Sequence, residues 1–264
     1  MTISFFAVLL ALGAIVGFLA GLFGIGGGLV VVPALVYLQP ALGIPNESLM
    51  SVTLGTSFAT IVITSFGSAQ RHYKLGNIQW NAAKILVPTL MITTYLASGL
   101  ITQLDRNVVS KIFAVLMLYL SVRMFMSVKM KDTGKRLTPA SAVMGGVSIG
   151  LASSAAGIGG GGLLVPFLHS RGISIEKAIG TSSLCSMLLG LAGTLGYIHN
   201  GWGVSGLPEY SLGYIYLPAV LGITSASFFT SKLGASATSK LPVATLKRCF
   251  ACLLVVIAIN MFMK

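Results

Sequence analysis

The chain has 264 residues, of which 55% are hydrophobic and only 8% are charged, and its mean hydropathy is +0.92. Soluble domains carry about 25% charged residues, so this composition excludes a water-soluble fold. Seventeen Lys and Arg against five Asp and Glu give a net charge of +12. Because the basic residues lie in short loops between apolar segments, they indicate a lipid bilayer as the environment and no nucleic-acid partner.

Apolar segments follow one another along the chain, separated by glycine, proline or charged residues. About 20 apolar residues are needed to cross a bilayer, so four segments of each half predict full spans. The second segment of each half is shorter and predicts a half-helix or a re-entrant arm. We therefore expect an all-α polytopic membrane protein with about five helical segments in each half. The segments are 4–22, 28–39, 48–70, 82–102 and 107–126, followed by 139–156, 161–170, 176–199, 211–231 and 241–263.

The two halves of the chain repeat each other. Residues 24–33 read GIGGGLVVVP and residues 157–166 read GIGGGGLLVP, with seven of the ten positions identical. The tripeptide Gly-Thr-Ser occurs at 55–57 and again at 180–182. The sequence thus predicts a first membrane repeat at residues 1–128, a polar cytoplasmic linker at 129–138 and a second membrane repeat at 139–264.

The distribution of basic loops favours two inverted repeats. The linker carries Lys129, Lys131, Lys135 and Arg136 and is placed in the cytoplasm. Five passages per half then bring the other strongly basic loops to the same side. An odd number of passages makes the halves antiparallel, as in many secondary transporters. If the short segments do not cross, eight full spans in parallel repeats remain open.

The two glycine clusters predict interrupted helices within the membrane. Each glycine is about 1 kcal/mol worse than alanine inside a helix, so a continuous helix is not expected there. A helix that restarts after the break presents free N–H groups and a partial positive charge, which bind anions without a basic side chain. We therefore predict that a small anionic substrate binds to two groups of residues that converge near the midplane. Close packing of helices through small residues is the alternative explanation. The predicted residues are Gly26, Gly27 and Gly28 of the first cluster and Gly159, Gly160 and Gly161 of the second.

Hydroxyl side chains recur beside these clusters at matching positions of the repeat. Thr56 and Ser57 correspond to Thr181 and Ser182, and for that reason we predict these four as further substrate ligands. No Asp or Glu lies within a predicted span, and no carboxylate pair, His cluster or nucleophile with a nearby base is visible. The sequence therefore predicts no catalytic residues, no metal site and no cofactor. A membrane-embedded enzyme is the less favoured interpretation.

The two glycine motifs, together with LGTS at 54–57, IGTSS at 179–183 and GNIQW at 76–80, resemble the TauE/SafE family of membrane transporters. The resemblance covers nearly the whole chain. It implies a multi-pass protein of the bacterial inner membrane that transports sulfite or an organosulfonate, with the family motif mapped onto residues 24–28 and 157–161. Alternating access of the two halves around a midplane site is the expected mechanism. A passive anion channel is the alternative, and a homo-oligomer remains open.

Overall fold

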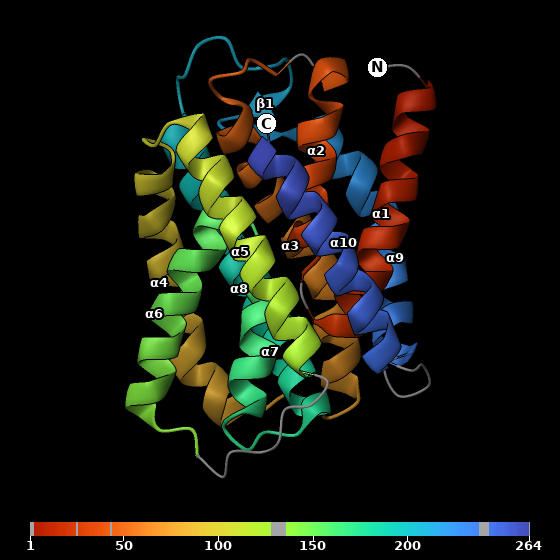
Figure 1. The fold of residues 1–264 in the computed structure, drawn as a ribbon, viewed down its shortest axis with the longest axis vertical. Helices are drawn as coiled ribbons and strands as arrows, with labels where there is room; N and C mark the ends of the chain where they lie inside the picture. The colour runs from red at the N-terminus through yellow and green to blue at the C-terminus, as the bar shows by residue number, and fades with distance from the viewer. Residues whose placement is uncertain (1–2, 25, 43, 128–135, 238–242, 264) are drawn as a thin grey trace.

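The computed structural model describes residues 3–24, 26–42, 44–127, 136–237 and 243–263 (Figure 1). Most of the predicted linker 129–138 therefore lies outside the described residues. Within the described part the chain is a helical bundle with one short hairpin. Its elements are α1 (Ile3–Phe23), α2 (Gly28–Leu42), α3 (Leu49–Lys74), α4 (Trp80–Ile101), α5 (Arg106–Ser127), α6 (Pro139–Ala156), α7 (Gly161–His169), α8 (Ile175–Gly201), β1 (Ser211–Leu212), β2 (Ile215–Tyr216), α9 (Leu217–Ala237) and α10 (Val243–Met263).

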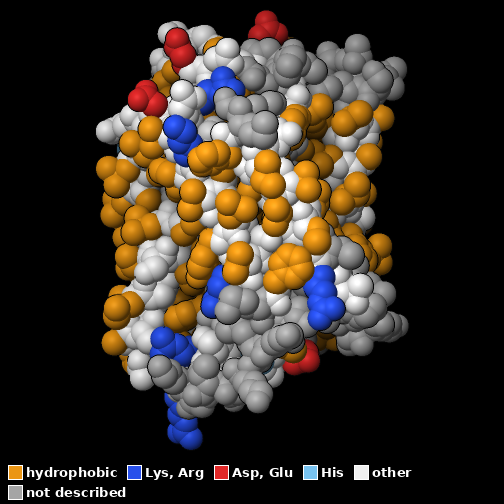
Figure 2. All heavy atoms as spheres, viewed as in Figure 1, with side chains coloured by type: hydrophobic (Ala, Val, Ile, Leu, Met, Phe, Trp, Pro, Cys, Tyr) orange, Lys and Arg blue, Asp and Glu red, His pale blue; other side chains and the backbone are white. Residues whose placement is uncertain are grey.

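Helices α3 and α8 form the centre of the bundle. Within the apolar stretch of each, 78% of the α3 residues and 67% of the α8 residues are buried, against 28% for α4. The outer helices expose large apolar side chains, such as Leu96 of α4, Met144 of α6 and Phe229 of α9. Figure 2 shows the result on one face, where a broad apolar band separates two ends that carry the charged side chains. This is the surface of a protein that sits in lipid.

Among the described residues, six helices are long and apolar enough to cross a membrane. They are α1, α3, α4, α5, α6 and α8. The prediction of an all-α multi-pass membrane protein is therefore confirmed. The short second segment of each half is also confirmed, because α2 has 15 residues and α7 has only 9.

One predicted boundary is wrong. The segment expected at 211–231 begins as a two-stranded hairpin, in which Ser211 pairs with Tyr216, and α9 starts only at Leu217. Gly213 takes a φ of +54° in the turn of this hairpin, a conformation that glycine adopts without strain. Pro218 then occupies the first turn of α9, where its missing N–H has no helical partner to lose. Aromatic residues around the turn made the hairpin look like the start of a membrane helix.

Close helix packing fixes the position of each interrupted helix. Gly13, Gly17 and Gly21 lie one turn apart on α1, and a Cβ added to any of them would run into the backbone of α9 at Ile223, Ser227 or Ser231. In the second half, α6 packs on α4 in the same way through Gly146 and Gly150, which meet the side chains of Thr89 and Thr93. Small residues at four-residue spacing allow such close approach in membranes.

Replacing Gly17 with Leu tests this packing. Its Cβ would lie 2.5 Å from the Cα of Ser227, so α1 must move away from α9. We expect a loss of about 2–3 kcal/mol in stability, the upper part of the range for overpacking. The measurement is the melting temperature of the detergent-purified protein. Ala11→Leu, on the exposed side of α1, is the matched control and should melt like the wild type. Equal melting of the two variants would contradict the packing argument.

Candidate functional site

The two glycine breaks meet inside the bundle. The first lies between the end of α1 at Phe23 and the start of α2 at Gly28, and the second lies between Ala156 of α6 and Gly161 of α7. A Cβ added to Gly26 would lie 3.2 Å from the Cα of Gly159, and one added to Gly28 would lie 3.0 Å from the Cα of Ile158. The described residues of both breaks are buried, so neither break faces lipid. The predicted convergence of the two helix interruptions is therefore present.

Backbone conformation shows why glycine is needed at the breaks. Gly26 and Gly27 have φ values of +74° and +89°, and Gly160 has a φ of +70°. Residues with a side chain rarely adopt these values. Gly27 and Gly160 act as N-caps, because their carbonyl oxygens accept the first helical hydrogen bonds of α2 and α7. The α2 and α7 helices thus restart with their N-terminal ends directed at the breaks.

The first turns of α2 and α7 leave backbone donors available. In the described part of the chain, no acceptor contacts the N–H groups of Gly28 and Leu29, or those of Gly161 and Gly162. Free N–H groups are intrinsic to a helix N-terminus, which carries a partial positive charge of about half an elementary charge. Two such ends beside each other create a buried electropositive region without a Lys or Arg side chain.

Serine hydroxyls bind the carbonyl oxygens of the breaks. The Oγ of Ser57 donates to the carbonyl oxygen of Gly157 at 2.7 Å, and the Oγ of Ser182 donates to that of Gly24 at 3.0 Å. Ser186 donates to the carbonyl oxygen of Gly159. Ser57 and Ser182, at matching repeat positions, each hold the break of the opposite half. These carbonyl oxygens therefore have hydrogen-bond donors, whereas the first N–H groups of α2 and α7 have no acceptor among the described residues.

The two threonines predicted as ligands also bind across the halves. The Oγ1 of Thr56 accepts a hydrogen bond from the N–H of Tyr216 at 2.9 Å, and that of Thr181 accepts one from the N–H of Gln79 at 2.8 Å. The structure thus brings the predicted glycines together and places all four predicted hydroxyls in bonds to backbone groups of the other half. A role of these hydroxyls in substrate binding stays a prediction.

Two buried serines that the sequence analysis did not single out lie against the breaks. The Oγ of Ser65 lies 3.2 Å from a Cβ added to Gly26, and the Oγ of Ser153 lies 3.2 Å from one added to Gly160. Both side chains are at most 1% exposed, and neither hydroxyl has a hydrogen-bond partner among the described residues. Buried hydroxyls normally find a partner, so these two leave hydrogen-bonding capacity beside both breaks that a polar ligand can use. The sequence analysis selected hydroxyls that recur at matching positions of the repeat. It did not select Ser65 and Ser153 because neither recurs in the other half.

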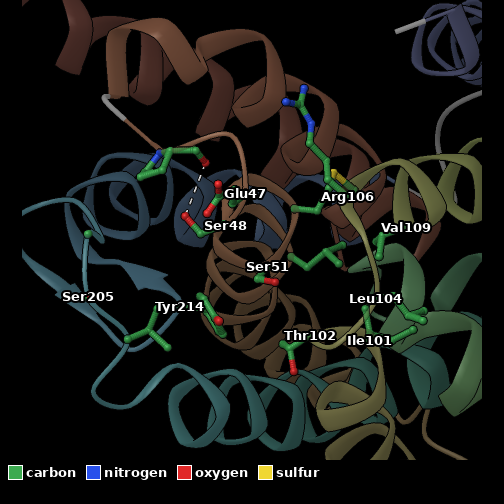
Figure 3. Close-up of a pocket in the computed structure, with 15 residues that line it drawn as sticks. Glu47, Ser48, Ser51, Ile101, Thr102, Leu104, Arg106, Val109, Ser205 and Tyr214 are labelled. Carbon is green, nitrogen blue, oxygen red and sulfur yellow. Dashed lines mark hydrogen bonds between the residues drawn. The ribbon is translucent and has the colours of Figure 1, made fainter.

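A cavity of about 330 Å³ lies above the breaks in the view of Figure 1, at the end of the bundle where α3 begins. Figure 3 shows the residues that line it. It lies between the start of α3, the end of α4 and the start of α5, and its polar lining includes Ser51 and Thr102. Arg106 stands at the rim, where its Nη1 donates to the Oδ1 of Asn46 at 2.7 Å. Leu54 lines this cavity and also packs against Gly157, with its Cδ2 2.7 Å from an added Cβ. The Leu54 side chain therefore separates the cavity from the second break.

Comparisons with known proteins assign a family. The model of the family described as sulfite exporter TauE/SafE matches residues 9–261. A probable membrane transporter protein of Haemophilus influenzae is 62% identical over 263 residues, which cover 99% of both chains. A probable membrane transporter protein of Methanocaldococcus jannaschii is 30% identical over 239 residues, covering 89% of this chain and 86% of the relative. The probable membrane transporter protein YunE of Bacillus subtilis is 24% identical, with 91% of both chains covered. No solved structure matches the chain.

Removing the hydroxyls that hold the breaks should destabilise the fold. Ser57→Ala or Ser182→Ala leaves a buried carbonyl oxygen without its donor, which costs about 1–3 kcal/mol. The melting temperature of each purified variant measures the loss. Ser225→Ala is the control, because this exposed hydroxyl bonds only to the Leu221 carbonyl oxygen of its own helix. If Ser57→Ala and Ser182→Ala melt like the control, the serines do not hold the breaks.

Proposed function

The chain belongs to the sulfite exporter TauE/SafE family of membrane transporters, and from this membership we propose that it is a secondary transporter for a small sulfur-containing anion, sulfite or an organosulfonate. The proposed site lies between the two glycine breaks. One observation carries this proposal: two helix N-termini converge in the bundle, and an unpaired buried hydroxyl accompanies each break. The ligand set comprises the N–H groups of Gly28 and Gly161, together with the hydroxyls of Ser65 and Ser153.

The chemistry of this ligand set suits an oxyanion that must be both bound and released. Backbone N–H groups and hydroxyls donate hydrogen bonds to the anion in place of water, and helix N-termini favour its negative charge. A Lys or Arg side chain at the same depth would add a full charge and strengthen binding. Neutral donors give an affinity that permits release on the other side. Ser57 and Ser182 contribute by donating to the carbonyl oxygens of Gly157 and Gly24, which weakens the repulsion between these oxygens and the anion.

The contacts between helices support two repeats that are related by a two-fold axis. In this relation α1 corresponds to α6, α3 to α8, α4 to α9 and α5 to α10. Helix α1 packs on α9 as α6 packs on α4, and α3 packs on α9 as α8 packs on α4. The contacts α3–α8 and α5–α10 each join two corresponding helices. The hydrogen bonds of Ser57 and Ser182 follow the same relation, because each serine binds the break of the other half. We propose that a pseudo-two-fold axis in the membrane plane relates α1–α5 to α6–α10 and passes between the breaks, as in transporters built from inverted repeats.

We propose alternating access of the two halves as the transport mechanism. The upper cavity reaches down to Leu54, which packs on the second break and closes the path from that side. The described glycines of both breaks are buried, so the proposed cycle must open a path to the site from each side in turn. We place the end that carries Arg71, Lys74 and Lys177 in the cytoplasm of a bacterium, following the distribution of basic loops, and the membrane is then the inner membrane.

Substituting the unpaired hydroxyls tests the proposed site without loss of the fold. Ser65→Ala and Ser153→Ala break no hydrogen bond within the described structure, so we expect melting temperatures near that of the wild type. Each substitution removes a donor to the anion and should raise KM for labelled sulfite uptake into proteoliposomes about tenfold, equivalent to about 1.4 kcal/mol. Ser148→Ala on the exposed face of α6 is the control. Unchanged KM in both variants would remove these serines from the site.

Exchange flux distinguishes a transporter from a passive channel. A transporter that alternates between two states should accelerate uptake of labelled sulfite when unlabelled sulfite is present on the opposite side, because the return of a loaded site is faster than that of an empty one. The measurement compares initial uptake into loaded and empty proteoliposomes at the same membrane potential. Uptake that follows only the gradient, without acceleration by internal sulfite, would favour the channel.

A further inference from the structure

A second cavity lies at the opposite end of the bundle from the one above the breaks, at the lower ends of α3 and α9. It has a volume of about 300 Å³ and is lined by six residues. Three are cations, Arg71, Lys74 and Lys232, and none is acidic. We propose that this cavity binds the headgroup of an anionic phospholipid from the leaflet at the basic end of the protein. The inference does not depend on the transported substrate.

Close contact between α3 and α9 creates the cavity. At Gly67 the two helices touch, because an added Cβ would lie 2.7 Å from the carbonyl oxygen of Phe228. One turn further along α3, Arg71 and Lys74 line the open space, and Lys232 faces them from α9. The distribution of basic loops explains why cations lie at this end. The distribution of basic loops does not explain why three cations line the same cavity. Binding of an anionic ligand explains it.

The position of the guanidinium group of Arg71 is fixed by a hydrogen bond. Its Nε donates to the Oγ of Ser236 at 3.0 Å, and that hydroxyl donates to the carbonyl oxygen of Lys232 at 2.8 Å. The two terminal nitrogens of Arg71 are not used in these bonds and match the paired oxygens of a phosphate. Arg71 thus provides hydrogen-bond donors for a phosphate in a fixed position, and the two lysines add positive charge.

Apolar side chains beside the cavity favour a lipid over a soluble anion. The Lys232 Nζ lies 3.9 Å from the centre of the Phe228 ring, and this ring stacks on Phe66 of α3 at 6.3 Å. Both rings precede the cations on helices that run toward this end, so they lie deeper in the bilayer. Phe229 and Leu233 continue this surface and are 66% and 62% exposed. A lipid can place its phosphate on the cations and its acyl chains along these side chains.

Native mass spectrometry of the purified protein tests the proposal. The wild type, mixed with equal amounts of phosphatidylglycerol and phosphatidylcholine, should retain one phosphatidylglycerol in preference. The double variant Lys74→Gln/Lys232→Gln should lower this preference about tenfold or more, since each basic residue near the surface contributes about 1 kcal/mol to the binding of anionic lipid. Lys74→Arg/Lys232→Arg should preserve the preference, because the charges remain.

The control removes two cations from the same end without touching the cavity. Lys84→Gln/Lys177→Gln changes exposed residues that do not line it and should behave like the wild type. Equal losses in the Lys74/Lys232 and Lys84/Lys177 variants would show a general effect of charge and overturn the proposal. Full displacement of the lipid by millimolar glycerol phosphate would also overturn it, because the ligand would then be a soluble anion.

Discussion

Backbone polar groups that leave a helix inside a bilayer must find partners, and this requirement shapes the centre of the protein. Both breaks expose carbonyl oxygens and N–H groups far from water. The carbonyl oxygens of Gly24, Gly157 and Gly159 are bound by serine hydroxyls from α3 and α8. The N–H groups of the restarting helices are left over. Within the described residues, serine hydroxyls thus bind three carbonyl oxygens while the first N–H groups of both helices lack an acceptor, an arrangement suited to a negatively charged ligand.

Glycine makes this arrangement possible in two distinct ways. Within the breaks, Gly26, Gly27 and Gly160 take positive φ values that turn the chain between two helices. Within the helices, Gly17 of α1 and Gly150 of α6 lie so close to their neighbours that any side chain would separate them. The second role fixes α1 and α6 against their neighbours, and the first lets the chain turn into α2 and α7 where the two breaks meet. The packing interpretation therefore applies to the glycines within the helices, and the binding interpretation stays a prediction for the glycines in the breaks.

Periodicity and duplication predicted most of the architecture. Apolar length defines helices well in a membrane protein, and the duplicated glycine clusters predicted the interruptions before Gly28 and Gly161 at the right residues. The hairpin at 211–216 was missed because its aromatic and apolar residues resemble a helix end. Ser65 and Ser153 were missed because neither recurs in the other half. A sequence also does not show that a hydroxyl lacks a hydrogen-bond partner, since this depends on its neighbours in three dimensions. The bonding of Thr56, Ser57, Thr181 and Ser182 was equally invisible, since a sequence shows hydroxyls without showing their acceptors.

The number of anions bound per chain tests most directly whether the two breaks form one shared site. Equilibrium dialysis of the purified protein against labelled sulfite measures it. A shared site predicts saturation at one anion per chain, with a single affinity that weakens when either half of the ligand set is altered. Saturation at two anions per chain, each sensitive to only one half, would contradict the account, as would the absence of any saturable binding.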